Sequence, residues 1–241
     1  MKNFEKALQC EKEYIKYVRQ YHKKPEKSFN DILIQECDYT NSQEYWDEKA
    51  YKKLLSKNYE IMHLDCSKEN IINYYINAIK NNQNIIGFID LDELCAWINM
   101  DGDSKIEEKL KAHNIKVQYY ENKGGCIING PEDFGIAIVS QTKNVNFNSI
   151  ANMFIEILRK YNVNAELNGN DIMVDGKKVA GCHCGQHGDT FIFGTIITLS
   201  DHLDLIHEIC PPHGDKEPGF IDNKELTKEV IEREVLNYFN K

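Results

Sequence analysis

The sequence predicts a mixed α/β (α+β) protein with a mostly antiparallel sheet flanked by helices. From about residue 59 onward, apolar runs of strand length alternate with segments of helical periodicity. Several strands follow one another through short polar turns, as at Asp175-Gly176, and such turns favour antiparallel pairing. Neither a G-x-G-x-x-G nor a G-x-x-x-x-G-K-[ST] loop is present, so the usual dinucleotide-binding and P-loop folds are excluded.

The composition is ordinary for a soluble globular protein: 241 residues, 41% hydrophobic and 28% charged. The formal net charge is −9 and no basic block stands free of acids, so we expect no nucleic-acid partner. No run approaches the ~18 apolar residues of a membrane span, and the N-terminus lacks the apolar core of a secretory signal. The eight cysteines form no CxxC pair, which favours free thiols and a cytoplasmic location.

Residues 3 to about 22 have the apolar stripe of an amphipathic helix, which Pro25 ends, and residues 28–59 predict at most a short second helix. The strands expected next are at 59–64, 85–89, 94–98, 117–120, 126–128 and 134–139, followed by those of the segment 162–199. Helices are expected after an N-cap at Ser67, from Asp103 or Ser104 to His113, and at 147–158, 201–210 and 224–239.

Lys178 is the residue that most strongly suggests chemistry. It lies in a strand of small apolar residues, Val179-Ala180-Gly181. Burying a lysine costs free energy unless an anion or a ligand accompanies it, so we interpret Lys178 as a clamp on a phosphate or carboxylate. The alternative is a strand lysine whose stem is buried and whose ammonium stays in water. Lys177 is the better candidate for a purely solubilising charge.

The Gly124-Gly125 pair stands between two expected strands. Adjacent glycines let backbone N–H groups approach a ligand closely, as in loops that cradle phosphate or carboxylate. An ordinary hairpin turn is the competing interpretation.

Thiols and imidazoles cluster near the end of the chain and suggest a metal site or a Cys–His nucleophile such as Cys184 with His187. On a strand, however, Cys182 and Cys184 face one side and His183 the other, so these three cannot converge. Buried thiols with surface histidines are the simpler interpretation, and we predict no metal ligands.

Taken together, several stretches resemble lipoate–protein ligase A and its relatives in the biotin/lipoate ligase superfamily. The matching stretches, in order, are Gly124-Gly125-Cys126-Ile127, Ala165-Glu166, Asn170-Asp171, Lys178-Val179-Ala180-Gly181 and Gly194-Thr195-Ile196-Ile197. The resemblance is good over residues 123–205, weaker back to residue 85 and not visible in the first 60. It implies a lipoyl/biotinyl transferase-like catalytic domain over residues 61–241, of class II synthetase-like type. From their helical pattern, residues 1–60 are expected to form an N-terminal helical extension packed on the same domain.

The resemblance also implies a reaction. ATP, with Mg²⁺, and lipoate would form lipoyl-adenylate, and the acyl group would pass to a lysine of a lipoyl carrier domain. That carrier would be a 2-oxoacid dehydrogenase E2 or a glycine cleavage H protein. Lys178 would act on the adenylate, and the other substrate or nucleotide contacts would be Gly124, Gly125, Cys126, Asn129, Asn170, Asp171, Gly181, Gly194 and Thr195. Ile127, Ile136 and Ile138 would line the tunnel for the apolar tail. The family's accessory domain does not fit in the ~20–30 residues after Gly219, so an accessory polypeptide is a possible partner.

The sequence departs from the family at substrate-contacting positions. Tyr119 and Tyr120 stand in place of an Arg-Arg pair, Asn129 in place of one histidine and Phe193 in place of another. Two alternatives therefore remain open. One is an octanoyl or lipoyl transferase that needs no ATP, with Cys210 as a candidate nucleophile; the other is a non-catalytic member that binds lipoate or a carrier.

Overall fold

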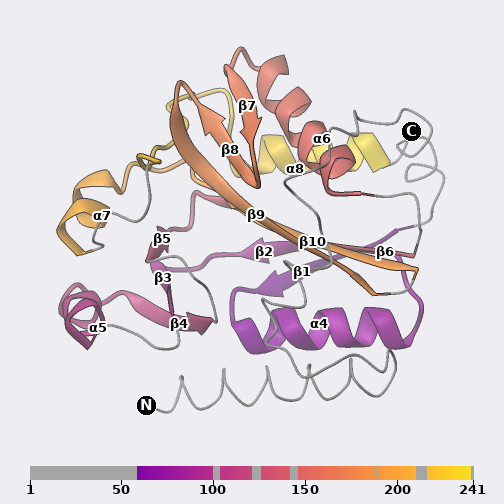
Figure 1. Ribbon diagram of the computed structural model, residues 1–241, viewed down its shortest axis with the longest axis horizontal. Helices are drawn as coiled ribbons and strands as arrows, with labels where there is room; N and C mark the ends of the chain where they lie inside the picture. Colours follow the sequence, from indigo (N-terminus) through magenta and orange to yellow (C-terminus); the bar gives the residue numbers. More distant parts are fainter. Residues whose placement is uncertain are drawn as a thin grey trace.

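The computed structural model describes residues 59–99, 104–120, 126–141, 146–187, 189–209 and 216–239. Its strands, labelled in Figure 1, are β1 (Glu60–Asp65), β2 (Ile85–Asp90), β3 (Cys95–Asn99), β4 (Lys116–Tyr120), β5 (Ile127–Asn129), β6 (Phe134–Gln141), β7 (Ala165–Asn168), β8 (Asp171–Val174), β9 (Lys177–His187) and β10 (Thr190–Ile197). Its helices are α4 (Lys68–Lys80), α5 (Ser104–Ala112), α6 (Phe147–Lys160), α7 (Leu203–Ile209) and α8 (Lys228–Phe239).

Seven of these strands form one sheet in the order β1-β2-β6-β10-β9-β8-β7. Only the β1–β2 pair in this sheet is parallel, and helix α4 makes the crossover that parallel neighbours need. The other neighbouring strands pair antiparallel. Strands β7, β8, β9 and β10 also follow one another along the chain, whereas β2, β6 and β10 are adjacent in the sheet but far apart in sequence. The predicted fold class, a mostly antiparallel sheet flanked by helices, is confirmed.

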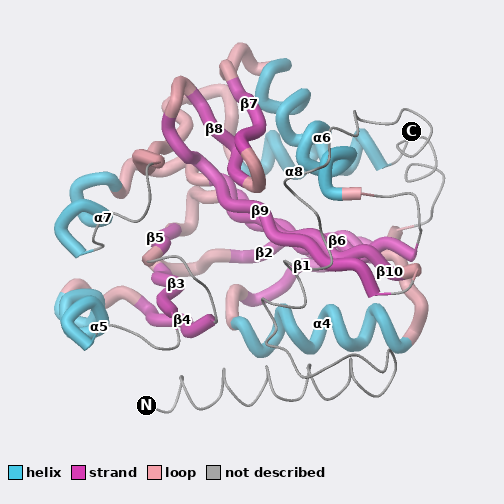
Figure 2. The backbone as a smooth tube through the Cα atoms, viewed as in Figure 1, coloured by secondary structure: helices cyan, strands magenta, loops and turns pink. Residues whose placement is uncertain are grey.

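The remaining strands form a second sheet, in the order β4-β3-β5, which the sequence analysis did not separate from the first. Strands β3 and β4 are parallel and joined by α5, and β5 pairs antiparallel with β3. This sheet has its own apolar cluster, which it shares with α5 and α7. Figure 2 places it beside one end of the large sheet.

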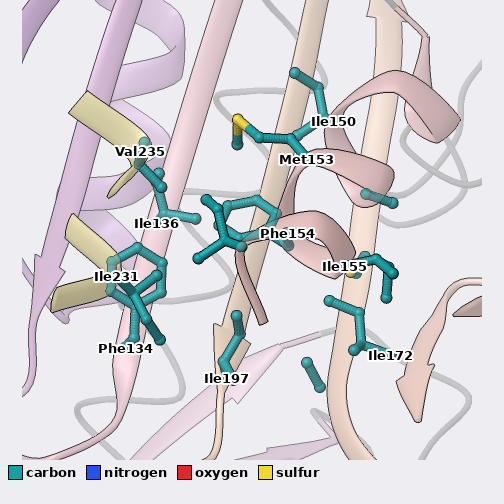
Figure 3. Close-up of a cluster of buried hydrophobic side chains, with 14 of the residues drawn as sticks. Phe134, Ile136, Ile150, Met153, Phe154, Ile155, Ile172, Ile197, Ile231 and Val235 are labelled. Atoms are coloured by element: carbon teal, nitrogen blue, oxygen red, sulfur yellow. The ribbon is translucent and has the colours of Figure 1, made fainter. Parts of the chain in front are cut away.

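Helices cover both faces of the large sheet: α4 lies on one face, and α6 and α8 lie on the other (Figure 1). The larger apolar cluster lies under α6 and α8, and Figure 3 shows Phe154 at its centre. Phe154 stacks on Phe193 with ring centroids 5.9 Å apart. Ile136 and Ile138 belong to this cluster, and so does Phe193. The expectation that Ile136 and Ile138 line a ligand tunnel is therefore wrong, because their side chains pack in the core beneath α6.

Local signals account for most of the element boundaries. Ser67 caps α4 as predicted, since its hydroxyl accepts from the Asn70 amide at 3.2 Å. Asn146 and Ser149 form a reciprocal capping box at the start of α6. Helix α8 begins later than predicted, because Thr227 accepts from the amide of Val230 and so caps it. Helix α7 is also shorter than the predicted range 201–210.

The predicted helices before residue 59, and with them the proposed N-terminal extension, lie outside the described residues. Ser104 begins α5, whereas Asp103 is also outside the described ranges. Among the helices that are described, none is both long and apolar enough to cross a membrane.

Candidate functional site

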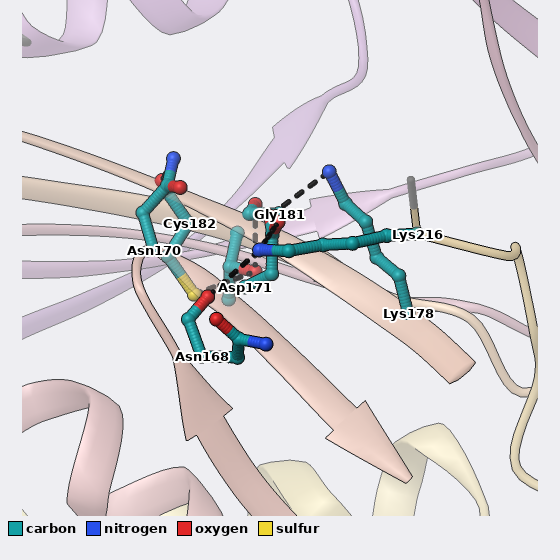
Figure 4. Close-up of polar contacts among 8 residues, drawn as sticks. Asn168, Asn170, Asp171, Lys178, Gly181, Cys182 and Lys216 are labelled. Carbon is teal, nitrogen blue, oxygen red and sulfur yellow. Dashed lines mark hydrogen bonds and ion pairs between the residues drawn. The ribbon is translucent and has the colours of Figure 1, made fainter. Parts of the chain in front are cut away.

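The site is built around an ion pair between β9 and β8 (Figure 4). The Nζ of Lys178 lies 2.9 Å from Oδ1 of Asp171. The Asp171 side chain is 8% exposed, whereas that of Lys178 is 36% exposed. The ammonium is therefore partly exposed, whereas the sequence suggested a buried one. It stands at the boundary with solvent and pairs with a carboxylate on the neighbouring strand, next to a register shift between Ile172 and Met173.

Gly181 provides the space over which Lys178 extends. A Cβ at Gly181 would lie 3.4 Å from the Lys178 Nζ and 3.6 Å from Oδ1 of Asp171. The next side chain, Cys182, packs in the core under α6, and neighbouring strand residues point to opposite faces. The ion pair consequently lies on the face of the sheet opposite α6.

Asn170 and Thr195 hold the backbone around this pair. The Asn170 side-chain amide donates to the Cys182 carbonyl at 3.1 Å, and the Cys182 amide donates back to the Asn170 carbonyl at 2.7 Å. The Thr195 hydroxyl donates to the Gly181 carbonyl at 3.1 Å and accepts from the Cys182 thiol at 3.5 Å. Four predicted contact residues (Asn170, Asp171, Gly181 and Thr195) thus come together with Lys178. In this arrangement Asn170 and Thr195 use their polar groups to position the strand.

Gly194 is next to this group in β10 but has a packing partner of its own. A Cβ there would lie 2.4 Å from the His183 ring and 2.9 Å from the Tyr75 hydroxyl. The Tyr75 hydroxyl lies 3.3 Å from Nε2 of His183. Burial lowers the pKa of His183 to about 4, because the imidazolium would lose its hydration. The missing side chain at position 194 therefore makes room for a neutral histidine.

Asn129 lies in a separate buried polar cluster at the turn between β5 and β6. Its amide nitrogen donates to Oδ2 of Asp133 at 3.3 Å, and Asp133 also accepts from the backbone amides of Gly130, Leu199 and Ser200. Oδ1 of Asn129 is buried without a hydrogen-bond partner among the described residues. The sequence analysis missed Asp133, which ties this turn to the end of β10.

The other predicted contacts are only partly placed. Cys126 is half-buried just before β5, whereas Gly124 and Gly125 lie outside the described residues. Ile127 is 39% exposed. The contacts of Lys178 within the described ranges involve none of these residues, and their roles remain predictions.

Lys216, a site residue that no sequence motif indicated, lies in the Pro- and Gly-rich segment before α8. Its Nζ is 2.7 Å from Oδ2 of Asp171 and 2.9 Å from the Asn168 carbonyl oxygen. Nothing in the local pattern identifies Lys216, because it lies 45 residues from Asp171 along the chain.

Among the described residues, the two cysteines of β9 and His183 do not converge on one point. Cys182 and Cys184 pack in the core while His183 faces Tyr75, which confirms the predicted alternation along the strand. Cys184 is disulfide-bonded, so the preference for free thiols is wrong at this position, whereas Cys66, Cys95 and Cys182 are free thiols. In the part of the chain that the structure describes, no three His, Cys, Asp or Glu side chains are grouped to hold a metal ion.

Comparison with known proteins now identifies the family. A profile described as the lipoyl protein ligase A/B catalytic domain matches residues 103–227, more than half of the chain. The chain belongs to the lipoyl protein ligase A/B family. That match includes the Lys178–Asp171 pair and Lys216, so the site described above lies inside the family's catalytic domain. Among curated proteins, none matches the sequence.

Solved structures with a similar fold include three proteins described with lipoate, ATP or a lipoyl domain. The LipL1 protein of P. falciparum, in complex with lipoate, has a TM-score of 0.61 at 14% identity, and the match covers 76% of this chain and 61% of that one. This family member therefore spans less than two thirds of the length of LipL1. A lipoate-protein ligase A bound with ATP has a TM-score of 0.58 at 15% identity, covering 76% and 84%. A bi-partite lipoate protein ligase from Thermoplasma acidophilum, studied with its E2 lipoyl domain, has a TM-score of 0.56 at 13% identity, covering 75% and 81%.

Proposed function

We propose that this protein is a lipoate–protein ligase that activates lipoate with ATP and transfers the lipoyl group to a lysine of a lipoyl carrier domain. One observation carries the proposal: a partly exposed lysine, fixed over a glycine by a buried carboxylate, lies within a lipoyl ligase catalytic domain. A positive charge fixed before the reaction stabilises charge that develops in the transition state without reorganisation.

In the first step, a lipoate carboxylate oxygen attacks the α-phosphorus of ATP, the bond to the β-phosphate breaks, and pyrophosphate leaves. In the second, the amine of the carrier lysine attacks the acyl carbon, the bond to the AMP oxygen breaks, and the amine loses a proton. Negative charge grows on the departing phosphate both times. The Lys178 ammonium is suited to neutralise it, and Asp171 keeps the ammonium in place between turnovers.

Mg²⁺ is expected with the nucleotide, but Asp171 does not fit as its ligand in this arrangement. Both carboxylate oxygens of Asp171 already accept from lysine ammonium groups, at 2.9 and 2.7 Å. A cation at that position would have to displace one of the two. We therefore assign Mg²⁺ to the phosphate oxygens of ATP, as part of the substrate complex.

The partners that we propose are a lipoyl carrier domain and an accessory polypeptide. The Thermoplasma ligase is described as bi-partite and was studied with its E2 lipoyl domain, which supports a lipoyl domain as acceptor here. We propose an E2 or H-protein lipoyl domain as the acceptor and an accessory polypeptide as a second component. Assays should therefore be run with and without such a component.

The alternative, thioester transfer without ATP, needs a reactive thiolate near Lys178. Cys182 is the described thiol closest in sequence, and burial raises its pKa to about 12, which leaves it protonated and inert. Cys210, the candidate suggested by the sequence, lies outside the described residues. If the protein transfers octanoyl groups from a carrier without ATP, and Cys210→Ala abolishes this transfer, the alternative is favoured over the ligase.

The decisive experiment measures lipoate-dependent exchange of label between pyrophosphate and ATP. Lys178→Ala should lower the exchange rate by about 100-fold or more, because it removes the fixed charge. Lys177→Ala is the matched control, since Lys177 is the adjacent strand residue, is 46% exposed and pairs with Glu217 instead of Asp171. No exchange at any lipoate concentration, with and without the accessory polypeptide, would contradict ATP-dependent activation. Equal rates for Lys178→Ala and wild type would contradict the role of Lys178.

A further inference from the structure

Lys216 is held beside Lys178 by several contacts. It was not among the site residues that the family resemblance implied. Its ammonium shares the Asp171 carboxylate with Lys178, each lysine taking a different oxygen (Figure 4). Asp171 comes from β8 and Lys178 from β9, whereas Lys216 comes from the segment that leads to α8. Three parts of the chain thus converge on one carboxylate.

The segment that carries Lys216 is fixed against β9 by its backbone. The Lys178 amide donates to the Glu217 carbonyl at 2.8 Å, and the Gly219 amide donates to the Lys178 carbonyl at 2.8 Å. This segment passes so close to β9 that a Cβ at Gly219 would lie 2.6 Å from the Cβ of Lys177. Lys216 is therefore held near Lys178 by the main chain as well as by its ion pair.

The charges at this point do not balance. Two ammonium groups face one carboxylate, which leaves an excess of one positive charge at neutral pH. Each ammonium has three N–H donors. Lys216 uses two of them on Asp171 and Asn168, and Lys178 has one contact, to Asp171, among the described residues. Donors remain on both lysines, and both side chains are about one third exposed. Such a pair can accept a further anion.

We propose that Lys216 and Lys178 together form an anion-binding clamp for a phosphoryl group, with Asp171 as the residue that positions both. The proposal rests on the proposed function in one respect: the natural ligand would be the phosphoryl group of the nucleotide or of the acyl-adenylate. The clamp supplies positive charge in a chain where tyrosines replace the family's Arg-Arg pair. Lysine binds phosphate as a point charge and without arginine's bidentate geometry, so two lysines are a reasonable substitute.

The test is calorimetric titration of the purified full-length protein with inorganic pyrophosphate, ATP or lipoate. Lys216→Ala should weaken binding of pyrophosphate and ATP by roughly tenfold, because a charge-assisted contact is lost. Lys216→Arg should restore most of the affinity, and the salt dependence of binding should be smaller for Lys216→Ala than for wild type. Lys177→Ala is the control and should bind like wild type. Thermal unfolding of each variant verifies that the fold is retained.

The outcomes separate this inference from the proposed function. Equal affinity of wild type and Lys216→Ala, or no binding of pyrophosphate and ATP by wild type, overturns the clamp. An effect of Lys216→Ala on lipoate binding alone also overturns it, since the site would then hold a carboxylate. If pyrophosphate binding depends on Lys216 while lipoate-dependent exchange is absent, the clamp stands and the ligase function fails.

Discussion

The neutral state of His183 predicts a specific loss of stability in mild acid. His183 lies in β9 against Gly194, with Tyr75 as its hydrogen-bond partner. Burial lowers its pKa from 6.5 to about 4, so the folded ring stays neutral where an unfolded ring binds a proton. Protons therefore bind preferentially to the unfolded chain. The stability that depends on the neutral ring is complete above about pH 6.5 and is lost as the pH falls toward 4.

The size of this effect follows from the two pKa values. With 6.5 for the unfolded chain and about 4 for the folded one, lowering the pH from about 8 to about 5 costs about 2 kcal/mol of unfolding free energy. That value is an upper estimate, because His183 as a residue is only partly buried and solvent screens charge at such positions. It is still a considerable fraction of the ~5–15 kcal/mol that stabilises a typical domain.

The assay is urea unfolding at a series of pH values for wild type and His183→Gln. Other groups titrate in both proteins, so the informative quantity is the difference between their unfolding free energies at each pH. This difference should shrink by up to about 2 kcal/mol between about pH 8 and about pH 5. Tyr75→Phe is the control: it removes the hydroxyl but leaves the burial that causes the shift, so its pH dependence should follow wild type. Parallel curves for wild type and His183→Gln would refute the reasoning.

Two further substitutions test the packing around the site. Gly194→Ala should cost about 1–3 kcal/mol, since its Cβ would overlap the His183 ring, and a melting temperature equal to that of wild type would disprove this overlap. Phe154→Ala should cost about 3–5 kcal/mol because Phe154 is fully buried at the centre of the core under α6; Ile61→Ala, at a 44% exposed position, is its control in the same denaturation experiment. Similar losses for the two would mean that the core is placed wrongly.

Most elements could be predicted because each leaves a local pattern. Helix α6 follows from apolar residues at helical spacing, and the Ser67 cap follows from one side chain and its neighbouring amides. Alternation along β9 correctly assigned Cys182 and His183 to opposite faces, since that depends only on the period of a strand. The α8 boundary was less accurate, because several residues before it could begin a helix and a contact of the Thr227 hydroxyl decides among them.

The candidate site was only partly predictable. Asp171 and Lys178 lie on adjacent strands close in sequence, and Asn170 is in the turn just before β8, so their meeting follows from a short hairpin. Asp133 and Lys216 were missed because each acts on residues far along the chain, and no local pattern encodes such contacts. Ile136 and Ile138 were expected to line a tunnel, because β6 is buried on both sides and its continuous apolar run does not distinguish a position that faces the core from one that faces a cavity.

The amino-acid sequence alone determined the element order, the mostly antiparallel fold class and the membership suggested by the Lys178 and glycine motifs, since these depend on short-range periodicity and spacing. Tertiary structure alone decided how the strands divide into two sheets, which face each apolar side chain occupies, and that two lysines share the Asp171 carboxylate. These features depend on the pairing and packing of distant segments, in which many residues compete for the same neighbours.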